Sequence, residues 1–257
     1  MCLHIDSIIA KFDGITLSQM DSVKLMNRTD RKYWFHRDQL AEILELVSKD
    51  YYILEIANQR NLPYSTIYYD TPQNEMYENH HRGKMNRYKI RRRNYVSTNS
   101  SFLEVKFKNN KGRTIKVRQP SNYHNINFDP MDAEFIRETT PYKCEELERA
   151  LENSFRRMML VSKGMNERCT IDSDLSFMSG ENSAELGELV VVEVKSEGRS
   201  HSAIIDALNS KRIKPAGFSK YCIGRSLTND ELKKNNFKQK HRAIKKEINN
   251  QINRTQL

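Results

Sequence analysis

Long apolar runs are missing from this 257-residue sequence, in which no stretch approaches the roughly 18 consecutive apolar residues of a transmembrane helix. The first residues, MCLHIDSIIAKFDG, lack the basic region and long apolar stretch of a secretory signal. The four cysteines are scattered and have no CxxC spacing, so they indicate neither a disulfide framework nor a zinc site. Together these absences favour a cytoplasmic protein with reduced thiols.

Positive charge is in excess, with a formal net charge of +10, but it is unevenly distributed. Half of the excess lies in residues 226–257, where a weakly amphipathic basic helix is predicted over 228–252. Such a helix is a candidate for binding an acidic surface or a membrane-protein partner, which would bring the protein to a membrane. The alternative is a helix packed on the outside of the domain. We therefore divide the chain into a loosely ordered lead-in (1–26), a main domain (27–226) and a basic C-terminal helix (227–257).

The main domain contains eight strand candidates, mostly linked as hairpins, with helices predicted over 131–138, 143–154 and 201–211. The best hairpin signal is Asn109-Asn110-Lys111-Gly112, which lies between two alternating runs. An antiparallel sheet is implied, and eight strands are enough to close into a barrel. The predicted fold class is therefore α+β, an eight-stranded antiparallel β-barrel with helices packed outside. The predicted strands cover 28–35, 64–70, 85–95, 102–108, 113–118, 157–163, 167–175 and 186–198.

Charged and apolar residues alternate along six of these strands. In YKIRRR, Lys89, Arg91 and Arg93 share one face of an extended chain, and Tyr88 and Ile90 share the other. The charged faces of the other five strands include Asp30, Lys32, Glu104, Lys106, Lys108, Lys116, Arg118, Arg168, Thr170, Asp172, Glu193 and Lys195.

Two interpretations of these charged faces remain open. In the first, the sheet is ordinary and its second face lies in water, decorated with cross-strand ion pairs. In the second, the helices cover the apolar faces, so the charged faces point inward and enclose a basic channel. Buried cations then need a polyanion, for which Arg and Lys around a channel suit phosphates. Carboxylates among them would hold a divalent metal, and the chemistry that follows is phosphoryl transfer.

Eight segments in order resemble the triphosphate tunnel metalloenzymes (the CYTH-like superfamily) over about residues 25–226. Within them, the sequence is most similar to the polymerase domain of the vacuolar transporter chaperones, in a stand-alone form of bacterial type. The segments are RTDRKYWF, YSTIYYDTPQNEMY, YKIRRRNY, FLEVKFK…GRTIKVR, FRRMML, RCTIDSDLSF, VVVEVKSEG and GFSKYCIG. The resemblance implies an eight-stranded tunnel that binds ATP, phosphate and a growing polyphosphate chain.

The resemblance also implies roles for particular residues. It makes Glu193 a metal-holding carboxylate for Mn²⁺ or Mg²⁺, with Glu104 as a second candidate. Lys89, Arg118 and Lys195 share the charged faces without a firm counterpart in the family, and we include them as phosphate-binding candidates. Carried over by position, the other phosphate-binding residues are Lys32, Arg91, Arg93, Lys106, Lys116, Arg157, Arg168 and Lys220, of which Lys32, Arg91, Arg93, Lys106, Arg168 and Lys220 are expected to act in catalysis.

Two departures from the family pattern bear on the activity. The ExExK motif of tunnel enzymes is replaced by residues 28–32, RTDRK, which argues against the hydrolytic branches. Gly217 stands where related polymerases often carry a lysine. The leading hypothesis is an ATP:polyphosphate polymerase. The alternatives are a tripolyphosphatase or a nucleoside or RNA 5′-triphosphatase of the same fold, and a nonenzymatic polyanion- or RNA-binding module. No DNA partner is expected, and the aromatic residues lie mostly on the apolar faces, which disfavours base stacking.

Overall fold

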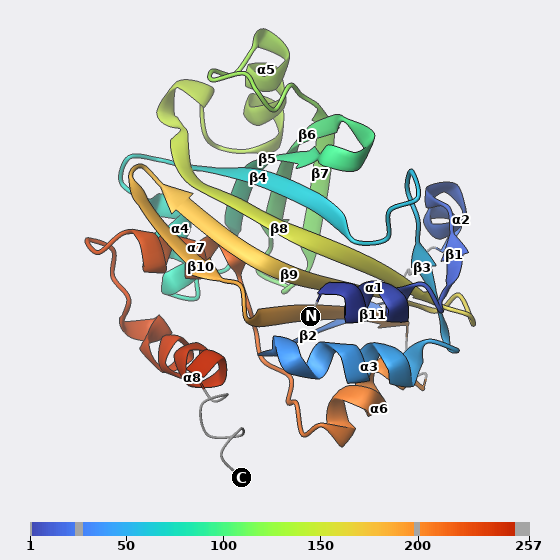
Figure 1. Ribbon diagram of the computed structural model, residues 1–257. Helices are drawn as coiled ribbons and strands as arrows, with labels where there is room; N and C mark the ends of the chain where they lie inside the picture. Colours follow the sequence, from blue (N-terminus) through green and yellow to red (C-terminus); the bar gives the residue numbers. More distant parts are fainter. Residues whose placement is uncertain (1, 24–27, 198–200, 250–257) are drawn as a thin grey trace.

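The computed structural model describes residues 2–23, 28–197 and 201–249 and is built on one long, curved antiparallel sheet (Figure 1). All eight predicted strands are present, and each pair of neighbours is antiparallel. The predicted α+β class is therefore confirmed. In sheet order the strands are β2 (Arg28–His36), β11 (Leu189–Glu197), β9 (Glu167–Ser179), β8 (Glu148–Ser162), β4 (Leu62–Asp70), β5 (Arg87–Tyr95), β6 (Ser100–Lys108) and β7 (Thr114–Pro120).

Three short strands extend the sheet at its margins. β3 (Tyr51–Leu54) pairs with β8, β1 (Asp13–Ile15) pairs in parallel with β3, and β10 (Asn182–Leu186) continues the β9 hairpin. The outermost strands of the main order, β2 and β7, are not paired with each other in the part of the chain that the structure describes. Instead, the segment before α7 (Lys220–Thr228) runs along β2, where the amide of Ala216 donates to the carbonyl of Lys32 at 2.7 Å. The sheet therefore curves without complete closure by backbone pairing.

Helices cover the outside of the β2, β11, β9 and β8 half of the sheet. α1 (Cys2–Ile9), α3 (Leu40–Val47) and α6 (Ala203–Ser210) pack there, and Figure 1 shows α1 and α3 lying across β11 and β2. The first hydrophobic core lies beneath them and takes the apolar parity of each strand, including Tyr33, Phe35, Val192 and Val194. The alternate residues of the same strands therefore face the concave side of the sheet.

A second hydrophobic core surrounds α7 and extends under α4 (Glu75–His81) and α5 (Pro130–Thr139). Asp70 joins two of these helices, because its carboxylate accepts hydrogen bonds from the amides of Met76 and Tyr77 and from the hydroxyl of Tyr221. Gly224 lets α7 approach the sheet closely, since a Cβ there would lie 2.6 Å from Leu151 Cδ2. The start of α7 is thereby fixed against the concave side of the sheet.

The N-terminal segment is more ordered than the sequence indicated, and the C-terminal helix begins later than the predicted residue 228. Residues 2–23 form α1, β1 and α2 (Leu17–Ser22), and they bury Ile9 and Phe12 in the first core and Met20 in the second. The expectation of a loosely ordered lead-in is therefore wrong for these residues. After α7, α8 (Lys238–Asn249) buries Ile244 in the second core, as expected for a packed helix. The ends of the predicted strand 186–198 and helix 228–252 lie outside the described residues.

One predicted helix is wrong. Residues 143–154 form a single 3₁₀ turn followed by the start of β8, because β8 pairs with both β4 and β9 along this stretch. The helical propensity of CEELERALE is outweighed by pairing on both edges. The short 3₁₀ helices are Arg37–Gln39, Val96–Thr98, Cys144–Glu146 and Asn235–Phe237. None of the helices among the described residues has both the length and the hydropathy to cross a membrane.

Candidate active site: a basic cavity inside the curved sheet

A cavity of about 660 Å³ lies on the concave side of the sheet, and its walls are strongly basic. Twelve lysines and arginines line it, against three carboxylates. The interpretation of an ordinary wet sheet face is therefore wrong, because the charged faces enclose a common space. The predicted phosphate-binding residues that line it are Lys32, Lys89, Arg91, Arg93, Lys106, Lys116, Arg157, Lys195 and Lys220.

Glu104 anchors two of these cations from beneath the cavity wall. Its side chain is fully buried; Arg91 donates to Oε2 from Nε at 2.8 Å, and Lys116 donates to Oε1 at 2.5 Å. Burial alone would raise the pKa of Glu104, but Arg91, Arg93 and Lys116 outweigh it and hold that pKa well below its usual range. Because both carboxylate oxygens are engaged and the residue does not line the cavity, the geometry argues against Glu104 as a metal ligand.

Asp172 plays a similar part on β9, and the sequence analysis did not assign it a role. Arg157 forms a bidentate pair with Asp172, at 2.6 and 2.8 Å, and Lys220 donates to the same carboxylate. The burial of Asp172 is outweighed by these two cations, which lower its pKa. Parity placed Asp172 on the charged face, but its pairing joins β8, β9 and α7, which only the tertiary structure brings together. Asp172 therefore fixes Lys220 at the start of α7.

Glu193 is the most accessible of the three acidic groups that pair with cavity cations. Its side chain is 25% exposed, compared with 4% for Asp172 and 0% for Glu104. Lys195 lies 2.7 Å from Oε1 and Lys32 lies 3.6 Å from Oε2. Burial raises the pKa of Glu193, but Lys32 and Lys195 outweigh it and lower the pKa, so the carboxylate stays ionised. An accessible, ionised oxygen pair of this kind fits a divalent metal.

The resemblance to triphosphate tunnel metalloenzymes implies a divalent metal, and the cavity offers such a metal few protein ligands. Among the described residues, the grouping of three potential metal donors is His36, Asp38 and Glu188, none of which lines the cavity. A metal beside Glu193 would therefore take most of its ligands from phosphate oxygens and water. This coordination is characteristic of Mg²⁺ in phosphoryl-transfer sites.

Several cavity cations have no carboxylate partner among the described residues. Arg93 donates to Thr66 Oγ1 at 3.2 Å, and its guanidinium lies 5.6 Å from the ring centre of Phe155. Lys106 forms no ion pair with an acid among the described residues, and the positive charge of Arg91, together with burial, lowers its pKa well below the usual value. Unpaired cations in a buried site are costly unless an anion arrives, so Arg93 and Lys106 mark where phosphates would bind.

Two of the predicted phosphate-binding residues do not line the cavity. The guanidinium of Arg118 lies over the ring of Phe102 at 4.6 Å, on the exposed edge strand β7. Arg168 donates to the carbonyls of Met20 and Val23 and so ties the N-terminal segment to β9. Strand parity identified the correct face in both cases, but it does not give the position along the strand or the direction of a long side chain.

Further lining residues were missed in the sequence analysis. Arg87 continues the charged parity of β5 by one step, so the pattern could have found it, whereas Lys108 was placed on the charged face of its strand without being given a role. Tyr68 and His80 also line the cavity. Lys240 comes from α8, and nothing in the sequence connects it with the strands.

Phosphate binding is expected to take up protons near neutral pH. Burial lowers the pKa of Lys116 to about 8, helped by Arg91 and Arg93 and opposed by Glu104. Bound phosphates would raise this pKa, so affinity for tripolyphosphate should fall as the pH rises from 7 to 9, where unliganded Lys116 loses its proton. Titration calorimetry at pH 8 in buffers of different ionisation enthalpy should show net uptake of up to about half a proton by Lys116, which is about half protonated at this pH before binding. Lys116→Gln should reduce the uptake, and an unchanged value would contradict the assignment.

An antiparallel sheet of eight strands curved around a basic, carboxylate-anchored cavity defines the triphosphate tunnel class of proteins. The family model described as the VTC domain matches residues 27–229. The chain therefore belongs to the VTC domain family, as the resemblance in the sequence implied. No protein with a curated description matches the chain.

Solved structures with a distant likeness include two bacterial proteins and one plant protein. A candidate adenylate cyclase from Vibrio parahaemolyticus has a TM-score of 0.47 and 12% identity, covering 78% of this chain and 99% of that one. Another from Bacillus halodurans has a TM-score of 0.46 and 14% identity, covering 76% and 96%. A candidate adenylyl cyclase from Hippeastrum, described as having a dominant triphosphatase activity, has a TM-score of 0.44 and 14% identity, covering 78% and 96%. At these scores no functional argument follows.

Proposed function

We propose that the protein is a metal-dependent polyphosphate polymerase that transfers the terminal phosphoryl group of ATP onto phosphate or a polyphosphate chain. The observation that supports the proposal is the excess of positive charge in the cavity, which is lined by twelve lysines and arginines and by three carboxylates. An elongated polyanion would compensate this excess along the whole cavity. Membership of the VTC domain family supports the same substrate class.

In the proposed reaction, an oxygen of the acceptor phosphate attacks the γ-phosphorus of ATP. The bond from that phosphorus to the β,γ-bridging oxygen breaks, and ADP leaves with the electron pair. Catalysis of this kind depends on alignment and charge neutralisation. Arg91 and Lys116, held by Glu104, and Lys220, held by Asp172, are preorganised to bind phosphate oxygens without reorganisation. Arg93 and Lys106 supply the uncompensated charge.

Glu193 would hold a divalent metal, which would supply positive charge against the negative charge that develops during transfer. The other contributions to this site come from side chains of the protein. Lys32 and Lys195 hold the Glu193 carboxylate in place through its two oxygens. On binding a metal, the carboxylate would give up contacts with Lys32 and Lys195. Both ammonium groups would then be available to bind phosphate. Mn²⁺ and Mg²⁺ both suit oxygen ligands, and we propose one of them.

Incubation of the purified protein with ATP and either Mn²⁺ or Mg²⁺ tests the proposal. The expected products are ADP and long polyphosphate, resolved by gel electrophoresis and ³¹P NMR, with turnover abolished by EDTA. Release of free phosphate without polymer would identify a triphosphatase instead. Tight binding of tripolyphosphate without any turnover would identify a polyanion-binding module.

A further inference from the structure

A second group of cations lines one end of the cavity, apart from the cations held by acids. Arg87 is the first residue of β5, and Lys108, its partner in the β5–β6 register, is the last residue of β6. Lys89 follows on β5 and donates to Ser219 Oγ at 3.0 Å. Lys240 reaches the same cavity from α8. We call Arg87, Lys89, Lys108 and Lys240 the mouth cluster.

The four residues of the mouth cluster act on a common point. His80 of α4 also lines the cavity, and its pKa is lowered to about 2 by burial and then by Lys89, Arg87, Lys108 and Lys240. The ring is therefore neutral at physiological pH and adds no positive charge. Its position shows that residues from β5, β6 and α8 project their charge into one region. The cluster is thus a single electrostatic site built from three elements.

No carboxylate neutralises the mouth cluster within the described residues. Elsewhere in the cavity, an acidic partner lies within 3 Å of each of Arg91, Arg157 and Lys195. In the mouth cluster, Lys89 donates to Ser219 and Arg87 donates to the carbonyl of Lys84. All four side chains are partly exposed. The mouth cluster therefore resembles a site for an extended anion at the opening of the cavity.

α8 is fixed in position by contacts on its other faces. Ile244 is 4% exposed, His241 lies 2.8 Å from the hydroxyl of Ser226, and Glu247 accepts the amide of His36 at 3.2 Å. Lys240 Nζ lies 3.7 Å from the point where a Cβ on Gly217 would stand. The missing side chain at Gly217 thus leaves room for an ammonium group from α8. This helix lies beyond residue 229, where the family match ends.

The surroundings favour a chain of phosphates over a nucleic acid. Tyr88 packs on Phe107 at 4.6 Å between ring centres, and Phe237 packs against Tyr77 and His81. These rings therefore pack against one another, and they offer no free platform for stacked bases. A linear polyphosphate needs only charge at regular intervals.

We propose that the mouth cluster binds the part of a linear polyphosphate chain that extends beyond the central phosphates, with α8 contributing Lys240. This inference rests on the proposed function for its ligand. With this second site the protein distinguishes long chains from tripolyphosphate. The other cations of the cavity bind tripolyphosphate without the mouth cluster. The C-terminal helix is then part of the binding site and not an independent basic tail.

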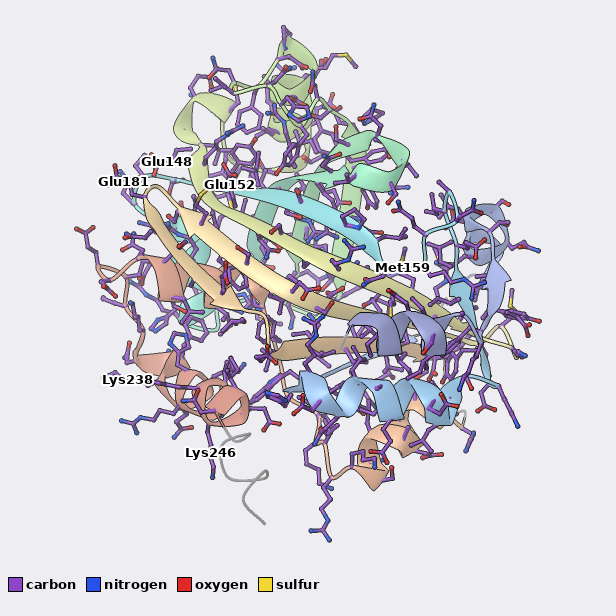
Figure 2. The ribbon with its side chains drawn as sticks, in the orientation of Figure 1. Glu148, Glu152, Met159, Glu181, Lys238 and Lys246 are labelled. Atoms are coloured by element: carbon purple, nitrogen blue, oxygen red, sulfur yellow. The ribbon has the colours of Figure 1, made fainter. Side chains whose placement is uncertain are left out.

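The test compares the affinities of two probes, sodium tripolyphosphate and linear polyphosphate of defined long chain length, for the full chain without metal. The variant Arg87→Gln/Lys108→Gln/Lys240→Gln removes three charges at the mouth. The control Lys49→Gln/Lys238→Gln/Lys246→Gln removes three exposed charges that do not line the cavity. Figure 2 shows Lys238 and Lys246 extending outward from α8. Melting temperatures establish that each protein is folded.

The mouth variant should lose about tenfold or more in affinity for long polyphosphate and change little toward tripolyphosphate, while the control keeps both affinities. Equal losses for both probes, or no loss for either, would overturn the inference. So would a single-stranded oligoribonucleotide that binds as tightly as polyphosphate and depends on the same residues. If the triple variant does not fold, Lys240→Gln alone should show a smaller loss with the same selectivity. Because binding is measured without ATP, failure of the polymerase proposal would be seen separately, in turnover.

Discussion

Replacing Glu193 with glutamine should lower turnover of ATP roughly hundredfold or more while the melting temperature changes little. The substitution keeps the shape of the side chain and removes its negative charge, so a metal held by Glu193 would be lost or misplaced. Glu193 is 25% exposed and its lysine partners can reach solvent or phosphate, so the loss of the ion pairs should cost little stability.

The same variant should bind tripolyphosphate at least as tightly as the unaltered protein when metal is absent. A negative charge has left a basic cavity, so the attraction for phosphates increases. Glu181→Gln is the matched control, because Glu181 is exposed at the turn between β9 and β10 and is labelled there in Figure 2. Turnover near that of the unaltered protein would remove Glu193 from the metal site. A large fall in melting temperature would instead assign Glu193 a structural role with Lys32 and Lys195.

Arg92 and Arg93 are adjacent in sequence, but their replacement should have different effects. Loss of Arg92 should lower stability, and loss of Arg93 should lower turnover. Arg92 is fully buried on the outer side of β5, paired with Asp132 and donating to the carbonyl of Asn125 at 2.6 Å. Arg92→Met would leave Asp132 buried without its partner and should cost about 3–5 kcal/mol of unfolding free energy. Urea denaturation measures this loss. Any folded fraction should keep its affinity for tripolyphosphate.

Arg93→Gln should leave stability unchanged or raise it, and should reduce turnover by about one to two orders of magnitude. Burial and the neighbouring charges of Arg91 and Arg157 lower the pKa of Arg93, so removing its charge relieves repulsion in the unliganded protein. The two variants are measured under the same conditions and serve as controls for each other. Loss of stability in Arg93→Gln, or loss of binding alone in Arg92→Met, would reverse the assignment of the two faces of β5.

Most of the correct predictions of cavity residues came from strand parity, because period-two alternation specifies which face of the sheet a residue occupies. It placed Arg91, Arg93 and Lys106 in the cavity and left Arg92 on the other side. For Arg168 it gave the correct face but not the direction of the long side chain, which turns back to the carbonyls of Met20 and Val23. A pattern along one strand contains no information about a neighbouring segment that competes for the same donor.

The carboxylates were harder to predict than the cations. Glu104 and Glu193 share the same parity, but one is sealed beneath two cations and the other is open to the cavity. Asp172 gained its role only when β8, β9 and α7 came together. The contribution of Lys240 depends on how α8 packs, and a basic helix of this composition gives no indication of it. The local sequence pattern therefore predicted which residues line the cavity walls. The ion pairs of the carboxylates and the position of Lys240 depend on tertiary contacts, which the pattern does not contain.

The contacts of Arg168 and Ile244 have a practical consequence for recombinant fragments of this protein. A fragment cut to residues 27–229, the span of the family match, would remove Ile9 and Phe12 from one core and Ile244 from the other. It would also leave Arg168 without the two carbonyls that it bonds. We therefore expect the unit that folds cooperatively to extend past both limits of the family match, and a shortened fragment to expose apolar surface that promotes aggregation.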